Sequence, residues 1–295
     1  MPKALFITTH TSDTHNHVDA WDWVADEPAS RVTFNYQGVK NDGQILEMAQ
    51  TCNPKVIFYI GAHSGPGLPK DETLRTLRSI APSVNLISDA ADRPWHYRIN
   101  HYRNAKCFDL HVGIDGDPVS PVDLVTLTPV NGRAFDQLVI PKKDIRCGFS
   151  GNASGKRARL LGILGSRCFV RVRGEDYKDH ASFLKRCRII FNTAYTGSGE
   201  RYHIKGRVVE AGFAGGALLE HVESPIKTWF PEEAYFTYED AEHAGRIVET
   251  ATDEDIKSRA ALLSKIVREK YTPAKIYGQI LDRLNVGHAL AVPAR

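Results

Sequence analysis

The sequence lacks the features that stabilise small secreted proteins or anchor proteins in membranes. Its five cysteines are odd in number, scattered and never in a CxxC pair, which is typical of free thiols in a reducing compartment and not of a disulfide or zinc framework. No apolar run is long enough to cross a bilayer, and no signal peptide precedes the first strand-like run. We therefore expect a cytoplasmic protein without a membrane span.

Two glycine motifs of common nucleotide-binding folds are also missing. No GxGxxG motif follows the first strand-like run, which argues against a Rossmann dehydrogenase. The run GNASGKR at 151–157 is not a Walker A motif, because its glycines are too close and Arg157 stands where Ser or Thr should be. The formal net charge of +3 is too small by itself to indicate nucleic-acid binding.

What the sequence does have is a regular alternation of short apolar runs and helical segments. We expect strands at residues 4–9, 31–36, 55–60, 84–88, 107–114 and 122–127, with helices at 42–51 and 71–81 between them. The pattern restarts near Pro141, with strands at 145–149, 167–173, 188–192, 217–219 and 234–237 and further helices up to 274–284. This rhythm predicts the α/β class, with two doubly wound, Rossmann-like domains at 1–141 and 142–272.

The stretch KGRVVEAGFAGGALLEH, residues 205–221, is the most informative part of the chain. Its apolar residues share one helix face up to Gly215, and a short run typical of a fully buried strand follows. Lys205, Arg207 and Glu210 then lie at the helix N-terminus, where free N–H groups and the dipole favour anions. Two cations there suit a diphosphate, and the carboxylate can accept bonds from sugar hydroxyls. The alternative is an ordinary helix start with solvated charges.

A second candidate phosphate site follows the predicted strand 145–149. Gly151 and Asn152 lie in a glycine loop, and Lys156 and Arg157 open the next helix. A strand, a glycine loop and a basic helix start can cradle a phosphate, although a simple turn has the same pattern. Between residues 142 and 207, Lys and Arg outnumber Asp and Glu by more than two to one. That excess indicates an anionic ligand.

Polar residues at strand exits of the first domain are candidates for acid–base chemistry. In open α/β sheets the loops at the carboxyl ends of the strands form the ligand crevice. His63 lies among glycines after strand 55–60, and Asp89 follows strand 84–88. Asp13 belongs to a polar run, 10–17, which we expect to be a loop and which also holds His10, His15 and His17. The alternatives are a plain surface loop and a turn-capping His63; the spacing in 10–17 matches no zinc pattern.

Several motifs, taken in order, resemble those of GT-B glycosyltransferases. The matching segments are IRCGFSGNASGKRARLLGIL, IIFNTAYTGSGERYHIKGRVVEAGFAGGALLEH and EAYFTYEDAEHAGRIV. The closest resemblance is to the spore-maturation (CgeB-like) group of the glycosyltransferase group 1 family. It covers most of the chain but is specific mainly in the second half. The first half matches loosely, through LISDAADRPW and the strand rhythm.

The resemblance implies two domains that face a cleft, with a nucleotide-diphosphate sugar held mainly by the second. It implies that helix 274–284 packs back on the first domain. In this family the phosphates are contacted by basic residues at the places of Lys156 and Arg157, and the nucleotide ribose is held by a carboxylate at the place of Glu210. Lys205 and Arg207 precede the donor helix. Together with Gly151 and Asn152, these residues form the expected donor site.

The implied reaction moves a hexosyl or pentosyl group to a hydroxyl acceptor, with the nucleotide sugar as co-substrate and no cofactor or metal required. If the reaction inverts configuration, His63, Asp13 or Asp89 is the expected base. Retaining relatives carry a Glu eight residues before Glu210, where this chain has Tyr202, with Glu200 nearby. The acceptor can be a small molecule, a glycan or modified DNA. The alternatives are a phage-type DNA base glycosyltransferase and a non-catalytic nucleotide or sugar-phosphate binding protein.

Overall fold

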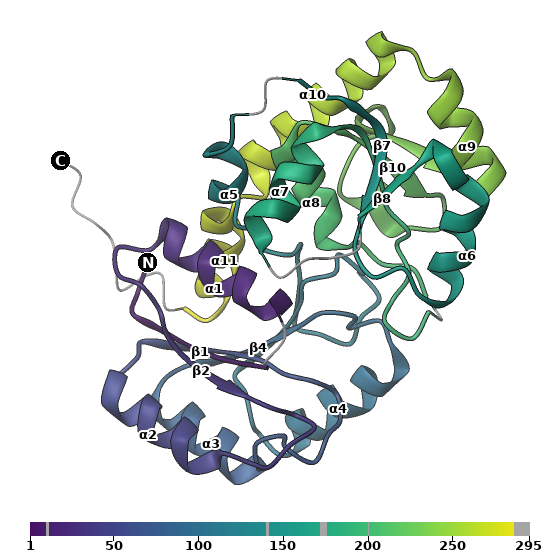
Figure 1. Ribbon diagram of the computed structural model, residues 1–295. Coiled ribbons are helices and arrows are strands. Elements are labelled where there is room, and N and C mark those ends of the chain that lie inside the picture. Colours follow the sequence, from purple (N-terminus) through teal and green to yellow (C-terminus); the bar gives the residue numbers. More distant parts are fainter. Residues whose placement is uncertain (10–11, 140–141, 172–175, 200, 286–295) are drawn as a thin grey trace. The chain divides into compact units, whose positions relative to one another are not determined.

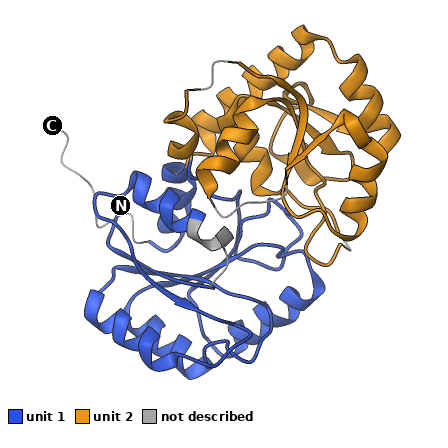
Figure 2. Ribbon diagram, viewed as in Figure 1, with its two compact units in different colours: residues 1–131, 273–295 blue, residues 132–272 orange. Residues whose placement is uncertain are grey.

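The computed structural model describes residues 1–9, 12–139, 142–171, 176–199 and 201–285, with only the backbone at 12–15. The chain divides into two compact units, shown in Figure 2. Unit 1 comprises residues 1–131 and 273–295, and unit 2 comprises residues 132–272. Within the described residues, no helix is long and apolar enough to cross a membrane.

Unit 1 is a six-stranded parallel sheet in the order β2-β1-β3-β4-β5-β6. Its strands are β1 (Ala4–Thr9), β2 (Ser30–Phe34), β3 (Val56–Ile60), β4 (Ser83–Ile87), β5 (Leu110–Gly113) and β6 (Leu124–Val125). Its helices are α1 (Ser12–Val24), α2 (Asp42–Cys52), α3 (Asp71–Ile80), α4 (Arg93–Asn104) and α11 (Pro273–Arg283). Figure 1 shows α2, α3 and α4 on one face of the sheet and α1 and α11 on the other.

Aromatic packing fixes the last helix onto unit 1. The Tyr277 ring on α11 lies 5.0 Å from Trp21 of α1 and 5.5 Å from Phe58 of β3, and Phe58 stacks on Phe6 at 4.8 Å. The Tyr277 hydroxyl donates a hydrogen bond to the His17 carbonyl at 2.7 Å. Helix α11 therefore lies in unit 1, as the resemblance implies.

Unit 2 is a five-stranded parallel sheet in the order β11-β10-β9-β7-β8. Its strands are β7 (Ile145–Ser150), β8 (Phe169–Arg171), β9 (Cys187–Phe191), β10 (Ala217–His221) and β11 (Tyr235–Tyr238). The helices are α5 (Arg133–Asp136), α6 (Gly155–Leu164), α7 (Tyr177–Arg186), α8 (Gly206–Ala214), α9 (Ala241–Thr250) and α10 (Asp253–Lys270), and the 3-10 turns are η1 (Gly165–Arg167), η2 (Pro225–Thr228) and η3 (Glu232–Ala234). Helices α6 and α9 pack together on one face, and α7, α8 and α10 cover the other (Figure 1).

Helices on both faces explain why the central strands are apolar runs and not alternating patterns. Every residue of β1, β3, β4, β5 and β10 is buried. This is the expected burial of parallel strands that are covered on both sides. The five cysteines are free, and all are buried. The predicted fold class, two parallel-sheet α/β domains, is confirmed.

The boundary between the units lies earlier than the sequence suggests. We expect it after residue 141, but unit 2 already begins at Gly132. The reason is the short helix α5, which has no strong sequence signal and packs on α7 and α8. The Lys185 ammonium donates to the Phe135 carbonyl at 2.8 Å, and Arg268 pairs with Asp136 at 2.7 Å. These bonds tie residues 133–136 to unit 2.

Besides α5, two helices were not expected from the sequence. The run 10–17 is not a loop throughout, because α1 begins at Ser12 and continues to Val24. Helix α4 follows β4, and the sequence suggests only a loop there. In both, the buried residues repeat at helical spacing, as at Trp95, Ile99 and Tyr102. Charged and histidine residues between those positions hide the pattern.

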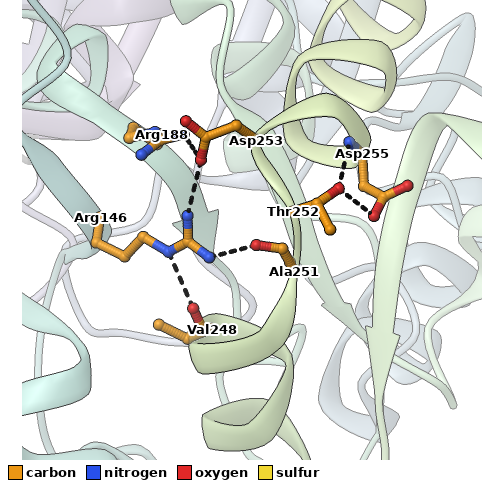
Figure 3. Close-up of polar contacts among 7 residues, drawn as sticks. All are labelled: Arg146, Arg188, Val248, Ala251, Thr252, Asp253 and Asp255. Atoms are coloured by element: carbon orange, nitrogen blue, oxygen red, sulfur yellow. Dashed lines mark hydrogen bonds and ion pairs between the residues drawn. The ribbon is translucent and has the colours of Figure 1, made fainter.

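Two arginines hold the link between α9 and α10 at the amino ends of the unit 2 strands (Figure 3). Arg146 of β7 donates to the Val248 carbonyl at 3.0 Å and pairs with Asp253 at 3.4 Å, and Arg188 of β9 pairs with the same carboxylate. The Thr252 hydroxyl oxygen accepts the Asp255 N–H at 3.1 Å and so caps α10. This polar cluster lies at the opposite edge of the sheet from the candidate site.

Candidate functional site

The topology of unit 2 creates a switch point between β7 and β9. The chain leaves β7 through α6 toward β8 on one side and leaves β9 through α8 toward β10 on the other. Loops that diverge from neighbouring parallel strands leave a crevice at the carboxyl edge of the sheet. Helices α6 and α8 both begin at this edge. The residues that precede them, Ser154 and Lys205, make no side-chain cap hydrogen bond to the helix. Backbone N–H groups at both starts are therefore left for other acceptors.

Lys156 and Arg157 lie in the first turn of α6, which begins at Gly155. The Lys156 ammonium is exposed and donates to the Gly199 carbonyl at 3.0 Å. Arg157 donates to the Thr193 hydroxyl at 3.0 Å and to the carbonyl of the exposed Asn152 at 2.6 Å. Both cations therefore reach from α6 to the loop 192–205, which leads into α8.

Gly151 gives the turn between β7 and α6 its shape. Its φ is +151°, a conformation that L-residues rarely adopt, and an added Cβ would lie 3.3 Å from the Phe149 ring. Its N–H donates to the Arg171 carbonyl at 3.2 Å. The glycine thus lets the chain turn sharply at the end of β7, beside the start of α6.

Arg207 and Glu210 form a buried network on α8. One Glu210 oxygen accepts the Tyr177 hydroxyl at 3.0 Å and lies 3.2 Å from His180 Nε2, and the other lies 3.4 Å from the Arg207 guanidinium. Burial by itself would raise the pKa of Glu210, but the charges of His180 and Arg207 and their hydrogen bonds outweigh it and lower that pKa. Glu210 is therefore an ionised carboxylate.

Ser150 and His180 extend this network under the switch point. The Ser150 hydroxyl is 2.9 Å from His180 Nδ1, and Arg207 donates to the Ser150 carbonyl at 2.5 Å. The network thus joins the end of β7 to α7 and α8. The sequence analysis did not single out Tyr177 and His180, because neither belongs to a local motif. Their only signal in the sequence is that His180 lies near the start of an amphipathic helix.

Tyr202, at the place of the retaining family's Glu, stacks on His221. The two ring centres are 4.3 Å apart, and the Tyr202 hydroxyl lies 3.3 Å from His221 Nε2. Tyr195 packs beside Tyr202 at 4.9 Å. Burial raises the pKa of the Tyr202 hydroxyl, which is therefore neutral. Glu200, its neighbour in sequence, lies outside the described residues.

Unit 1 has its own switch point, between β1 and β3. His63 follows β3, and its exposed ring lies 3.0 Å from the Ser64 hydroxyl through Nδ1, while its carbonyl accepts a bond from Arg98 at 2.6 Å. Asp89 follows the neighbouring strand β4 with a positive φ of 58°. Two of the three candidate bases therefore lie at the same sheet edge. Asp13 lies in the first turn of α1, after β1, but its side chain is outside the described residues.

The run 10–17 supplies less acid–base chemistry than its histidines suggest. His10 and the side chain of His15 lie outside the described residues. His17 is buried in α1, and burial lowers its pKa to about 4, against a smaller opposing effect of a hydrogen bond to the Pro129 backbone. Its imidazole is therefore neutral and packed inside unit 1. Among the described residues, no three His, Cys, Asp or Glu side chains come together as they do around a metal ion.

The second half of the chain matches a known protein family. Residues 150–282, a little under half of the sequence, match the model of a family described as glycosyl transferase-like. No curated protein sequence matches the chain. The family match spans the candidate donor loops and helices of unit 2 and continues into α11.

Solved structures with the same fold cover almost the whole chain. Anabaena Alr3699/HepE in complex with UDP and glucose aligns at 10% identity with a TM-score of 0.64, over 97% of this chain and 100% of that one. A glycosyltransferase from Rickettsia africae ESF-5 aligns at 9% identity and a TM-score of 0.59, over 96% and 98%. An α-glucosyltransferase in complex with UDP-glucose and DNA containing an abasic site aligns at 6% and 0.61, over 96% and 99%.

At such low identities these structures establish the fold, which is the two-domain GT-B fold. The family match gives the glycosyl transferase-like character of residues 150–282, which the fold alone does not supply. The second half of the chain is therefore a glycosyl transferase-like domain, in a protein with the GT-B fold.

Proposed function

We propose that unit 2 binds a nucleotide-diphosphate sugar at the carboxyl ends of β7 and β9 and that the sugar passes to a hydroxyl group held by unit 1. The observation that carries the proposal is the convergence of two helix starts with four cations at one switch point. Helix N-termini with adjacent Lys and Arg are favourable sites for phosphate groups. The Anabaena and α-glucosyltransferase structures, which share the fold, hold UDP or UDP-glucose.

The four cations divide into two kinds. Lys156 and Lys205 flank the starts of α6 and α8, and Arg157 joins α6 to the loop, so these three are the proposed diphosphate ligands together with the backbone at Gly151 and Asn152. They would stabilise the charge that develops on the leaving diphosphate. Arg207 has a structural role instead, because its guanidinium already contacts the Ser150 carbonyl, His180 and Glu210.

Glu210 is the proposed ligand of the nucleotide ribose. A carboxylate can accept about four hydrogen bonds, so contacts with Tyr177, His180 and Arg207 leave it acceptor capacity. Its ionised state, favoured by the contacts with His180 and Arg207, suits that role. His63, Asp89 and Asp13 are the proposed bases for the acceptor hydroxyl in an inverting reaction, because each follows a strand at the carboxyl edge of unit 1.

The charge of unit 1 favours a small acceptor or a glycan over duplex DNA. Its residues, 1–131 and 273–295, contain 14 Lys and Arg against 16 Asp and Glu. Duplex binding depends on neutralising several phosphates with cations, and unit 1 carries a net negative charge.

We also propose that the protein belongs beside the spore-maturation group, on the motifs of its second half. We place it in the cytoplasm, because its five thiols are free.

The donor site is tested by calorimetric titration with a panel of nucleotide sugars, followed by release of the nucleoside diphosphate on turnover. Lys156→Ala and Lys205→Ala should each weaken binding about 10- to 100-fold, since each loses a charge-assisted contact with the diphosphate. Lys265→Ala, on the exposed face of α10, is the matched control. Normal binding by both site variants would show that the diphosphate lies elsewhere.

A further inference from the structure

A fully buried acid lies beneath the loop that joins β9 to α8. Glu220, the fourth residue of β10, has no exposed surface. One of its carboxylate oxygens accepts the Asn192 side-chain N–H at 2.7 Å, and the other accepts the backbone N–H of His221 at 3.1 Å. A buried carboxylate without partners is strongly destabilising, so these bonds explain how the side chain is tolerated but not why an acid is placed there.

The position of Glu220 relates it to both ends of the loop 192–205. Asn192 is the first residue of that loop, and its carbonyl is itself held by the Tyr238 hydroxyl at 2.8 Å. Lys205 is the last residue of the loop, and its positive charge acts on Glu220. The same loop supplies the oxygens that bind Lys156 and Arg157, at Gly199 and Thr193. Glu220 therefore lies at the base of the segment on which three proposed diphosphate ligands depend.

The surroundings of Glu220 place its pKa near neutral pH, so both the acid and the carboxylate are populated there. Burial raises its pKa to about 7, and this rise is already reduced by hydrogen bonds from Asn192 and His221 and by the charge of Lys205. On the neighbouring strand β11, burial raises the pKa of Tyr238 and that of Tyr235, so both phenols are neutral. Burial also lowers the pKa of the His221 imidazole, which is therefore mostly neutral at pH 7. Of the groups named in this paragraph, Lys205 is the one whose charge acts on Glu220.

We propose that Glu220 is a positioning residue of the donor site, which holds Asn192 at one end of the loop, interacts by charge with Lys205 at the other, and takes up a proton from solvent when the nucleotide sugar binds. This inference rests on the proposed placement of the diphosphate beside Lys205. The donor brings negative charge to the ammonium that otherwise stabilises the Glu220 carboxylate. Added like charge favours the neutral acid, so a proton adds to a carboxylate oxygen, and Lys205 is left to pair with the phosphates.

The coupling between proton binding and donor binding then determines how donor affinity changes with pH. Because the bound complex holds the proton more tightly, donor affinity should be highest below the pKa of the free protein and should fall as the pH rises through it. A shift of about one pKa unit on binding gives a roughly tenfold weaker Kd at about pH 8.5 than at about pH 6. A residue with only a structural role would not produce this profile.

The test is calorimetric titration of the whole protein with UDP-glucose, whose diphosphate diester keeps a constant charge over this range. At about pH 7, in two buffers of different ionisation enthalpy, the wild-type protein should take up about half a proton on binding. Glu220→Gln, a neutral isostere, should abolish both the uptake and the dependence of Kd on pH while retaining the tight binding seen at low pH. Glu233→Gln, an exposed acid next to β11, is the matched control and should behave as the wild type.

Several outcomes separate this inference from the proposed function. If the wild type binds no nucleotide sugar of the panel, the proposed function fails and the inference with it. If Lys205→Ala weakens binding but Glu220→Gln keeps the wild-type pH profile, the donor site stands and the role of Glu220 is wrong. Absence of proton uptake by the wild type contradicts the inference even if Glu220→Gln does not fold. Glu220→Ala, which cannot hold Asn192, should weaken binding at every pH, and Gln should restore it at low pH.

Discussion

Two glutamates ten residues apart show how two buried acids can differ in ionisation state. Glu210 lies between His180 and Arg207, which lower its pKa, and Glu220 lies in a strand core where burial raises the pKa to about 7. Both are buried, so the difference comes from the cations within reach of each. Active sites often separate titratable groups in this way. One acid is a permanent anion in the proposed donor site, and the other is able to exchange a proton near neutral pH.

The effect of replacing Glu210 on the stability of the protein tests whether its carboxylate is ionised. Its folded pKa is below the unfolded value, so its contribution is present above about pH 4.5 and is lost as the pH falls through that value toward the folded pKa. Glu210→Ala should destabilise unit 2 by about 3 kcal/mol at neutral pH, because Arg207 and His180 lose a buried partner. The deficit should shrink in acid. Chemical denaturation at several pH values measures it.

The control for that experiment is Glu223→Ala, an exposed acid in the loop after β10. Its stability should follow that of the wild type at each pH. A Glu210→Ala protein as stable as the wild type at neutral pH would mean that the buried network does not hold α7 against α8. Because Glu210 has this structural role, loss of donor binding in its Ala variant cannot by itself assign the ribose contact. Lys156 and Lys205 are therefore the cleaner test positions.

Local motifs in the sequence predicted part of the site but not all of it. Lys156, Arg157, Lys205, Arg207 and Glu210 belong to two helix starts, which can be recognised within ten residues of sequence. The partners of Glu210 come from α7, on a different part of the chain, and only the packed helices bring them together. Glu220 was hidden for another reason. At the end of an apolar strand, a lone acid suggests exposure, whereas the structure buries it completely.

At the scale of elements, strands were easier to predict than helices. An apolar run between turn residues marks a strand that is buried on both faces, and the central strands of both sheets fit this description. Helices α1 and α4 were missed because charged and histidine residues interrupt the apolar stripe that each of them buries, which includes Trp21 in α1. In α4 the stripe is Trp95, Ile99 and Tyr102, and Pro94 near its start is a typical helix signal.

The link between α9 and α10 offers a test at the opposite edge of the unit 2 sheet. Arg146 donates to carbonyls at the end of α9, Val248 and Ala251, and pairs with Asp253 at the start of α10 (Figure 3). Arg146→Met keeps the aliphatic stem but leaves both carbonyls without this donor, so it should destabilise unit 2 by about 2 kcal/mol. Donor affinity should not change, because these contacts lie at the amino ends of β7 and β9.

Thermal unfolding and nucleotide-sugar titration of the same variant check both parts of that expectation. Arg246→Met, on the exposed side of α9, removes a charge without removing such contacts and serves as the control. A loss of donor affinity at unchanged stability would show that the amino edge of this sheet influences the donor loops, contrary to the separation proposed here.

At the scale of the whole molecule, the chain passes between its units twice. It leaves unit 1 after residue 131 and returns at Pro273, so α11 completes a core whose other elements lie between residues 4 and 125. The solved structures share this two-domain arrangement at about 10% identity or less. What they share is the fold, that is, the arrangement of strands and helices. That pattern is encoded by apolar spacing, which many sequences can satisfy.

The return of α11 makes the stability of unit 1 depend on the end of the chain. Tyr277 is fully buried against Phe6, Trp21 and Phe58, and its hydroxyl holds the His17 carbonyl. Tyr277→Ala should destabilise unit 1 by about 4 kcal/mol, as expected for removing a large buried ring. Tyr277→Phe keeps the ring and should lose about 1 kcal/mol with the hydrogen bond. Hydrogen exchange resolved by residue reads the two units separately: amides of β1 and β3 should lose protection while those of β9 and β10 keep theirs, because all four rings belong to unit 1. Equal loss in both units would show that they unfold as one cooperative body, and α11 would then stabilise the whole molecule.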